Sequence, residues 1–285
     1  MDQCNSGNAY PETLYKYYSQ SGLEKTLSTN TFKWALPCEE NDPFEALASG
    51  WDKVAIRNEV NDATKQDEAF LDAIFRSCQL QKTISHIAAY VSFSELNDSI
   101  LMWSHYAEGH AGACIEVDVA KLKTLADNFS PVAYAEEDEA ERKRIPVVKD
   151  DACDESQDAI RDFLAFKAKA WEYEKEWRLI IPPMADCIEA DSGGNILVSK
   201  IPTGAIKCLI FGYNMPIPKR LTMAKLVRKN HPKCQFAEAM PDRKQYKLII
   251  KPLEIDTEFP TEKKPSHIVQ CVRNDAQFTF FNPEV

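Results

Sequence analysis

Strand-like segments stand at both ends of this chain, and helical segments of uneven length separate them. The strand-like segments are 14–19, 31–37, 88–95, 109–119, 173–183, 208–215, 233–241 and 246–254. Amphipathic periodicity of three to four residues predicts helices at 21–30, 47–88, 99–109, 119–129, 156–171 and 218–232. Because strands and helices do not alternate regularly, the order favours an α+β fold, with mixed or antiparallel sheets and helical insertions, over a βαβ repeat.

The 285 residues fit one large domain. We expect a single α+β domain over residues 1–255, interrupted by a charged insertion near 134–155, and a C-terminal extension over 256–285. The insertion is indicated by the run YAEEDEAERKR, which has too few apolar residues to contribute to a core. Asn97 or Asp98 is expected to cap the helix that starts at Ser99.

Net charge and cysteine usage restrict the partners. A net charge of -10 without a basic stripe argues against an extended duplex nucleic-acid surface, although a local basic pocket for a small phosphorylated ligand stays compatible with it. The nine cysteines show no C-x-x-C spacing, so we expect free thiols and no metal. No basic, apolar leader opens the chain and no apolar run is long enough to span a membrane. These features predict a soluble, cytoplasmic protein without a membrane partner.

The sequence EKE at 174–176 is the most suggestive element for chemistry. On a strand, Glu174 and Glu176 share one face about 7 Å apart, and two such carboxylates can divide the work of orienting a substrate and accepting a proton. The aromatic residues around them, Trp171 among them, indicate a partly dry site. The alternative is an exposed strand face with solvated charges. Arg178 is expected to pair with one carboxylate, which also fits a structural bridge.

Two further segments carry candidate residues. In MWSHYAEGH at 102–110, His105 is a candidate acid or base near neutral pH; the alternative is a core-packing helix in which a backbone carbonyl satisfies His105. In ENDPFE at 40–45, Asn41 is a candidate for ordering a substrate ribose, and turn chemistry alone is the alternative.

Five segments together resemble the domain of unknown function 2971 family. They are LYKYYS (14–19), TFKWALPCEENDPFEA (31–46), YVSFSELNDSILMWSHYAEGHAGACIEVD (90–118), WEYEKEWRLII (171–181) and IKCLIFGYNM (206–215). Many relatives carry a basic residue directly after the YKY, where this chain has Tyr18, so no role of that basic group is carried over. The family name implies no function.

The order of Y-x-Y, S-F-S and E-x-E segments is similar to that of the ADP-ribosyltransferase superfamily. The resemblance implies that Glu176 holds the ribose hydroxyls of NAD⁺ and stabilises an oxocarbenium-like transition state, while Glu174 positions the acceptor. It also implies residues that line the NAD⁺ site: Tyr15, Lys16, Tyr17, Ser92, Ser94 and, stacked on the nicotinamide ring, Tyr106.

The implied function is an NAD-dependent ADP-ribosyltransferase or NAD glycohydrolase-like enzyme acting as a toxin or defence effector. Its ligand is a small nucleotide, NAD as substrate, and its acceptor is a protein or a nucleic acid. One alternative is a non-catalytic nucleotide- or protein-binding module. Another is a metal-dependent phosphoester hydrolase that uses His105 and the two glutamates.

Overall fold

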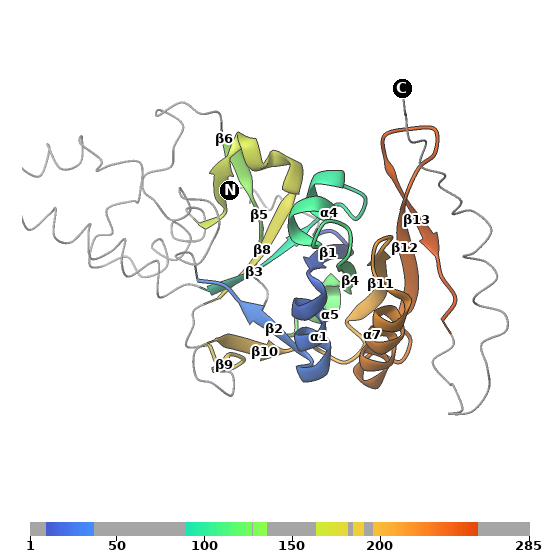
Figure 1. Cartoon of the computed structure of the whole chain (residues 1–285). Coiled ribbons are helices and arrows are strands. Elements are labelled where there is room, and N and C mark those ends of the chain that lie inside the picture. The colour runs from blue at the N-terminus through green and yellow to red at the C-terminus, as the bar shows by residue number, and fades with distance from the viewer. Residues whose placement is uncertain are drawn as a thin grey trace, which may run out of the picture. The chain divides into compact units, whose positions relative to one another are not determined.

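A mixed sheet of eight strands organises the part of the chain that the computed structural model describes, residues 10–36, 89–126, 128–135, 164–181, 185–190 and 196–255 (Figure 1). All neighbouring strands run antiparallel except β11 and β12, which are parallel. In order across the sheet, the strands are β13 (Leu248–Pro252), β12 (Gln235–Pro241), β11 (Ile206–Gly212), β4 (Ala113–Asp118), β1 (Thr13–Tyr18), β3 (Ala89–Ser94), β8 (Glu176–Ile181) and β5 (Phe129–Pro131).

Two smaller sheets and short helices complete the described part. The antiparallel three-stranded sheet comprises β2 (Thr31–Trp34), β10 (Leu197–Lys200) and β9 (Glu189–Ala190), and the parallel pair comprises β6 (Ala133–Ala135) and β7 (Phe166–Ala168). The helices are α1 (Gln20–Thr29), α4 (Ile100–Tyr106), α5 (Val119–Leu122), α7 (Ile217–Asn230) and the 3-10 helix η2 (Lys169–Glu174). This mixture confirms the predicted α+β class, and the mixed sheet agrees with it.

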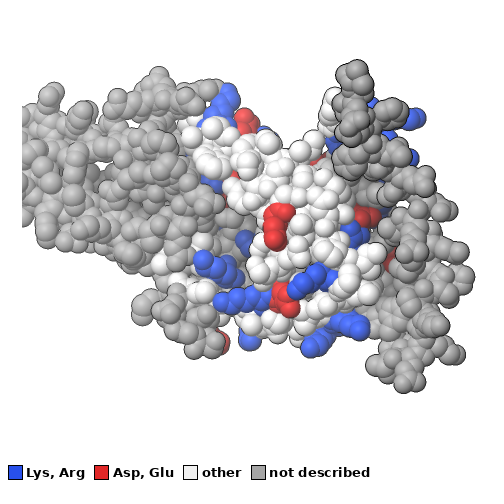
Figure 2. Space-filling model, in the orientation of Figure 1, with Lys and Arg blue, Asp and Glu red and all other residues white. Residues whose placement is uncertain are grey.

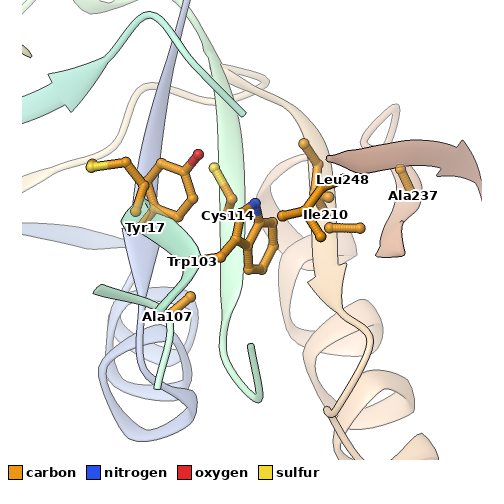
Figure 3. Packing of buried hydrophobic residues seen from close by; sticks show 9 residues of the cluster. Tyr17, Trp103, Ala107, Cys114, Ile210, Ala237 and Leu248 are labelled. Carbon is orange, nitrogen blue, oxygen red and sulfur yellow. The ribbon is translucent and has the colours of Figure 1, made fainter. Parts of the chain in front are cut away.

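Helix α4 packs on the large sheet through Trp103. Its indole is fully buried and meets the ring of Tyr17 edge-on, with the ring centroids 5.4 Å apart, in the cluster that includes Cys114 and Ile210 (Figure 3). Burying an aromatic side chain of this size removes a large apolar area from water, which stabilises the contact between helix and sheet. The short helix therefore has a fixed position beside β1 and β4.

The loop that enters α4 corrects the predicted cap. Ser99 is the N-cap, and its hydroxyl accepts a hydrogen bond from the backbone N–H of Met102. The carbonyl of Asn97 instead accepts the indole N–H of Trp103 at 2.7 Å. The prediction of Asn97 or Asp98 as the cap was wrong. The loop carbonyls here accept hydrogen bonds from buried aromatic side chains, and Ser99 is the residue that directly precedes the first helical residue.

Tertiary pairing also overrides three predicted boundaries. The helix expected at 119–129 ends at Leu122, because residues from Phe129 onward pair with β8 as β5. Most of the described end of the helix expected at 156–171 is instead β7 and η2. Tyr134 and Ala135, assigned to the charged insertion, belong to β6, which pairs with β7.

Several expectations fall outside the described residues. These are the turn at 40–46, the helix at 47–88 and most of the insertion and the extension, at 136–155 and 256–285. The chain divides into two units, Met1–Glu254 and Ile255–Val285. All elements above belong to the first unit, and the predicted boundary after 255 stays a prediction.

A buried histidine joins α1, α7 and β11. His231, 1% exposed, is the C-cap of α7. Its Nδ1 accepts the backbone N–H of Ile206 at 3.3 Å, and its Nε2 donates to Oδ1 of Asn30 at 2.9 Å. Asn30 is the left-handed C-cap of α1. Because Nδ1 must accept, the ring is neutral in the folded protein.

Acid should therefore destabilise the fold through His231. Burial, and secondarily the Lys121 ammonium, lowers the pKa of His231 to about 4. The unfolded histidine binds a proton near pH 6.5, so stability is lost as the pH falls from about 6.5 towards 4. We expect the free energy of unfolding to drop by about 1–2 kcal/mol between pH 7 and pH 5 through this residue. Urea denaturation at both values should show this drop in the wild type and a smaller one in His231→Gln. Equal drops would contradict the assignment.

Candidate functional site

The three strands that carry the Y-x-Y, S-F-S and E-x-E segments are neighbours in the large sheet, in the order β1, β3, β8. Tyr15 pairs with Ser94, and Ser94 pairs with Glu176. Side chains directly opposite one another on adjacent strands project from the same face of a sheet. Segments far apart in the sequence therefore place a phenol, a hydroxyl and a carboxylate in one row.

Side chains alternate between the two faces of a strand, and this alternation shows on which face each remaining predicted residue of these strands lies. Tyr17, Ser92 and Arg178 lie two positions from the row, on the same face as it. Lys16 projects from the opposite face, where its ammonium lies 5.8 Å from the centroid of the Phe93 ring. The structure thus places Lys16 on the face opposite the row, although the resemblance implies that Lys16 lines the NAD⁺ site.

Three buried charged side chains surround the carboxylate of Glu176, and we refer to these three, Lys167, Glu174 and Arg178, together with Glu176 as the ion cluster. Nζ of Lys167 lies 2.8 Å from Oε2 of Glu174 and 2.7 Å from Oε2 of Glu176. Nε of Arg178 lies 2.8 Å from Oε1 of Glu176. Exposure is 4% for each glutamate, 8% for Lys167 and 0% for Arg178. The alternative of solvated charges on an exposed strand face is therefore wrong.

Glu174 reaches the cluster from a helix and not from the strand. Strand β8 begins at Glu176, Glu174 ends η2, and Lys175 between them has a left-handed backbone with φ 43°. Ser94 fixes this turn, because its hydroxyl donates to the carbonyl of Glu174 at 2.6 Å. Both carboxylates touch one nitrogen, so they lie closer together than the predicted spacing of about 7 Å along a strand.

Two phenols from outside the large sheet contact the two glutamates, one at a carboxylate and the other at a backbone N–H. The hydroxyl of Tyr106 on α4 donates to Oε1 of Glu174. The hydroxyl oxygen of Tyr134 on β6 accepts the backbone N–H of Glu176 at 2.8 Å. Burial raises the pKa of both phenols, and for Tyr106 the bond to Glu174 raises it further. Tyr106 therefore stays protonated and remains a hydrogen-bond donor.

The cations decide the ionisation of the cluster. Burial by itself raises the pKa of Glu176, but Arg178 and then Lys167 outweigh it and lower that pKa to about 2. Burial likewise opposes the charge on Lys167, but the net effect, with Glu176 the largest favourable contribution, is a raised pKa. Glu176 is thus an anion at any physiological pH. It can accept hydrogen bonds and stabilise a nearby positive charge, but it cannot donate a proton.

Aromatic side chains lie between the cluster and the surface. His105 is exposed on α4, with its ring centroid 6.4 Å from that of Tyr106 and 6.2 Å from that of Tyr173. Tyr173 is half-buried and lies 6.2 Å from Trp171, between centroids. Because His105 is exposed, the core-packing alternative describes Met102 and Trp103 of this helix and not His105.

Sequence reasoning missed two side chains of this site, Lys167 and Tyr134. Lys167 was assigned to an amphipathic helix and Tyr134 to the insertion, but the two residues pair in the β6–β7 ribbon. The alternation of FKAKAW at 166–171 is the one signal that could have indicated an extended Lys167. The expected pairing of Arg178 with one carboxylate is confirmed. Asn41 lies outside the described residues.

Features outside the cluster bear on the expected partners. In the part of the face that Figure 2 describes, basic and acidic side chains are interspersed. In the described ranges, no group of three or more His, Cys, Asp or Glu side chains is placed to hold a metal ion. None of the described helices has the length and apolar character needed to cross a membrane. The described cysteines, Cys114, Cys187, Cys208 and Cys234, are free thiols.

Comparison with known proteins gives one match. Residues 102–179, from α4 to β8, match the model of a family described as "Protein of unknown function (DUF2971)". The matched segment contains all four residues of the ion cluster, and over residues 102–179 it supports the resemblance to this family that the motifs indicated. No curated protein and no solved structure matches.

Removal of Arg178 should unbalance the cluster. Arg178→Met leaves two buried carboxylates with one cation, and we expect a loss of about 3–5 kcal/mol in the free energy of unfolding. The double variant Glu176→Met/Arg178→Met restores the balance and should recover most of that loss. Urea denaturation at pH 7 measures both.

An exposed ion pair provides the control for this comparison. Lys219 pairs with Glu24 at 3.2 Å on the surface, and Lys219→Met should cost less than about 1 kcal/mol. A double variant no more stable than Arg178→Met would contradict the charge-balance argument.

Proposed function

We propose that this chain, whose residues 102–179 match the DUF2971 family model, acts on NAD⁺ as an ADP-ribosyltransferase or NAD glycohydrolase. The observation that carries the proposal is the row of Tyr15, Ser94 and Glu176 on adjacent strands, with Glu176 held as an anion. The resemblance to ADP-ribosyltransferases implies that these segments line one site, and their position on neighbouring strands supports the proposal. The proposed substrate is NAD⁺, and the proposed acceptor is water, a protein or a nucleic acid.

The chemistry needs a carboxylate that remains ionised. When nicotinamide leaves the ribose, positive charge develops at the sugar, and a fixed anion beside it lowers the barrier. Glu176 meets that condition because Arg178 and Lys167 keep its carboxylate charged in a buried setting. Burial also strengthens the interaction, since water screens it less than at the surface.

In the proposal, the substrate reaches the second carboxylate from the side of Tyr106 and His105. Glu174 accepts from Tyr106, which is half-buried, and Tyr106 and Tyr173 both neighbour the exposed ring of His105. Such aromatic rings suit stacking by a flat nicotinamide. In the proposal, Glu174 positions the acceptor, and His105, beside Tyr106 and Tyr173, is the candidate acid or base.

One observation favours the non-catalytic alternative, a module that binds a nucleotide or a protein. Both carboxylate oxygens of Glu176 already have cationic partners, at 2.8 Å from Arg178 and 2.7 Å from Lys167. A carboxylate with both oxygens paired in this way can stabilise the fold without contacting a substrate. Calorimetry that shows NAD⁺ binding without turnover would favour this module. The hydrolase alternative has no comparable support, because Lys167 and Arg178 already neutralise the carboxylates that a metal would need.

The decisive substitution is Glu176→Gln, which keeps the shape of the side chain and removes its charge. Purified protein is incubated with NAD⁺, with and without protein and nucleic-acid acceptors, and free nicotinamide is measured by chromatography. We expect the rate of nicotinamide release to fall by about 100- to 1,000-fold, as for loss of one electrostatic contribution to a transition state.

Glu172→Gln is the matched control. Glu172 is an exposed glutamate of the same 3-10 helix, paired with Lys175 at 3.0 Å, so its loss should leave the rate unchanged. Thermal melts establish that both variants are folded. A wild-type protein that releases no nicotinamide with any acceptor would refute the proposed activity.

A further inference from the structure

We propose that Lys167 is a positioning residue that holds Glu174 and Glu176 side by side, both ionised, for the reaction on NAD⁺; this inference rests on the proposed function. Its ammonium nitrogen lies 2.8 Å from one carboxylate and 2.7 Å from the other. The two glutamates come from different elements, the end of η2 and the start of β8. Lys167 joins them through a third element, β7.

The β6–β7 ribbon presents Lys167 to the carboxylates. In its parallel register Tyr134 pairs with Lys167, and the hydroxyl of Tyr134 accepts the backbone N–H of Glu176. The ammonium also lies 5.5 Å from the centroid of the Trp171 ring, in a cation–π contact. Lys167 is therefore packed on several sides, and its position does not depend on the carboxylates alone.

The charge of Lys167 has a specific consequence for the pair. Two carboxylates this close cannot both ionise readily without a compensating cation, and they then share a proton. Arg178 compensates Glu176 through its Nε, at 2.8 Å. The ammonium of Lys167 supplies the second positive charge, so the pair needs no proton. A proton on the pair would weaken the anion that the proposed chemistry requires.

The geometry also explains why a lysine suits this position. An ammonium is a compact point charge with three donors, and two of them serve acceptors in different directions here. A guanidinium is planar and forks towards a single carboxylate, as Arg178 does with Glu176. Arginine at 167 would keep the charge but would bridge the two glutamates less well.

The test is Lys167→Met, measured by nicotinamide release between pH 6 and pH 9. At pH 7 we expect kcat to fall by about 100-fold with KM little changed, because reacting groups are misplaced and one is protonated. The activity of this variant should then rise with pH as the shared proton leaves. Lys167→Arg should keep the pH profile of the wild type at a reduced rate.

Lys175→Met is the matched control, because Lys175 adjoins both glutamates in sequence yet pairs with Glu172 on the surface. It should change neither the rate nor the pH profile. If Lys167 only supports packing, Lys167→Met would lower the melting temperature and leave the pH profile of the remaining activity as in the wild type. That result would overturn the proposal.

A second measurement separates this inference from the proposed activity. Carbon-detected NMR of the glutamate carboxyl groups should show both carboxylates ionised at pH 7 in the wild type, and one proton bound to the pair in Lys167→Met. If the wild type releases no nicotinamide but the variant binds that proton, the proposed activity fails and the action of Lys167 on the carboxylates stands. Titration curves that match between the two proteins would overturn the inference.

Lys167→Met leaves excess buried negative charge, so a second variant guards against loss of the fold. Glu174→Gln/Lys167→Met removes one negative charge together with the positive one. The proposal expects this double variant to fold, with Glu176 ionised at pH 7 in the same NMR measurement. A double variant that is unfolded would overturn the proposal, because Lys167 would then serve packing and not the carboxylates.

Discussion

Balance of buried charge is the constraint on which this part of the structure depends. Glu174 and Glu176 are each 4% exposed, and a buried carboxylate is costly unless a cation and hydrogen bonds replace the water it loses. Lys167 and Arg178 supply the charges, and Tyr106 supplies a further donor to Glu174. Because these partners come from β7, β8 and α4, the requirement links three separate elements of the fold.

The same requirement explains why local patterns failed around the site. Sequence periodicity correctly predicted the strands of the large sheet other than β5, the helices α1 and α7, and the start of α4 to within one residue, since each buries a regular apolar face. It failed at β5, η2, β6 and β7, which are three to six residues long. Elements this short contain too few residues to show a hydrophobic periodicity in the sequence, so pairing with distant segments decides their conformation.

The site was predictable in outline and not in its contacts. The resemblance to ADP-ribosyltransferases assigned Tyr15, Ser94 and Glu176 to one site, and the strand that carries each of them was recognisable because its pattern is local in sequence. The convergence of Glu174 depends on the left-handed backbone of Lys175, which no residue type other than glycine signals clearly. Lys167 and Tyr134 depend on a pairing between segments more than 30 positions apart, which a single sequence does not encode locally.

The arrangement of charges within the cluster matters more than their sum. Two anions and two cations cancel, yet they are not interchangeable in position. Arg178 is fully buried and lies with its guanidinium carbon 4.3 Å from the centroid of the Tyr90 ring, on the core side. Glu174 lies on the side of the half-buried Tyr106 and the exposed His105. The carboxylate of Glu174 therefore lies on the side of these rings, whereas the guanidinium of Arg178 lies against the core. A neutral cluster arranged in this way remains stable in the fold because each carboxylate has a cation beside it.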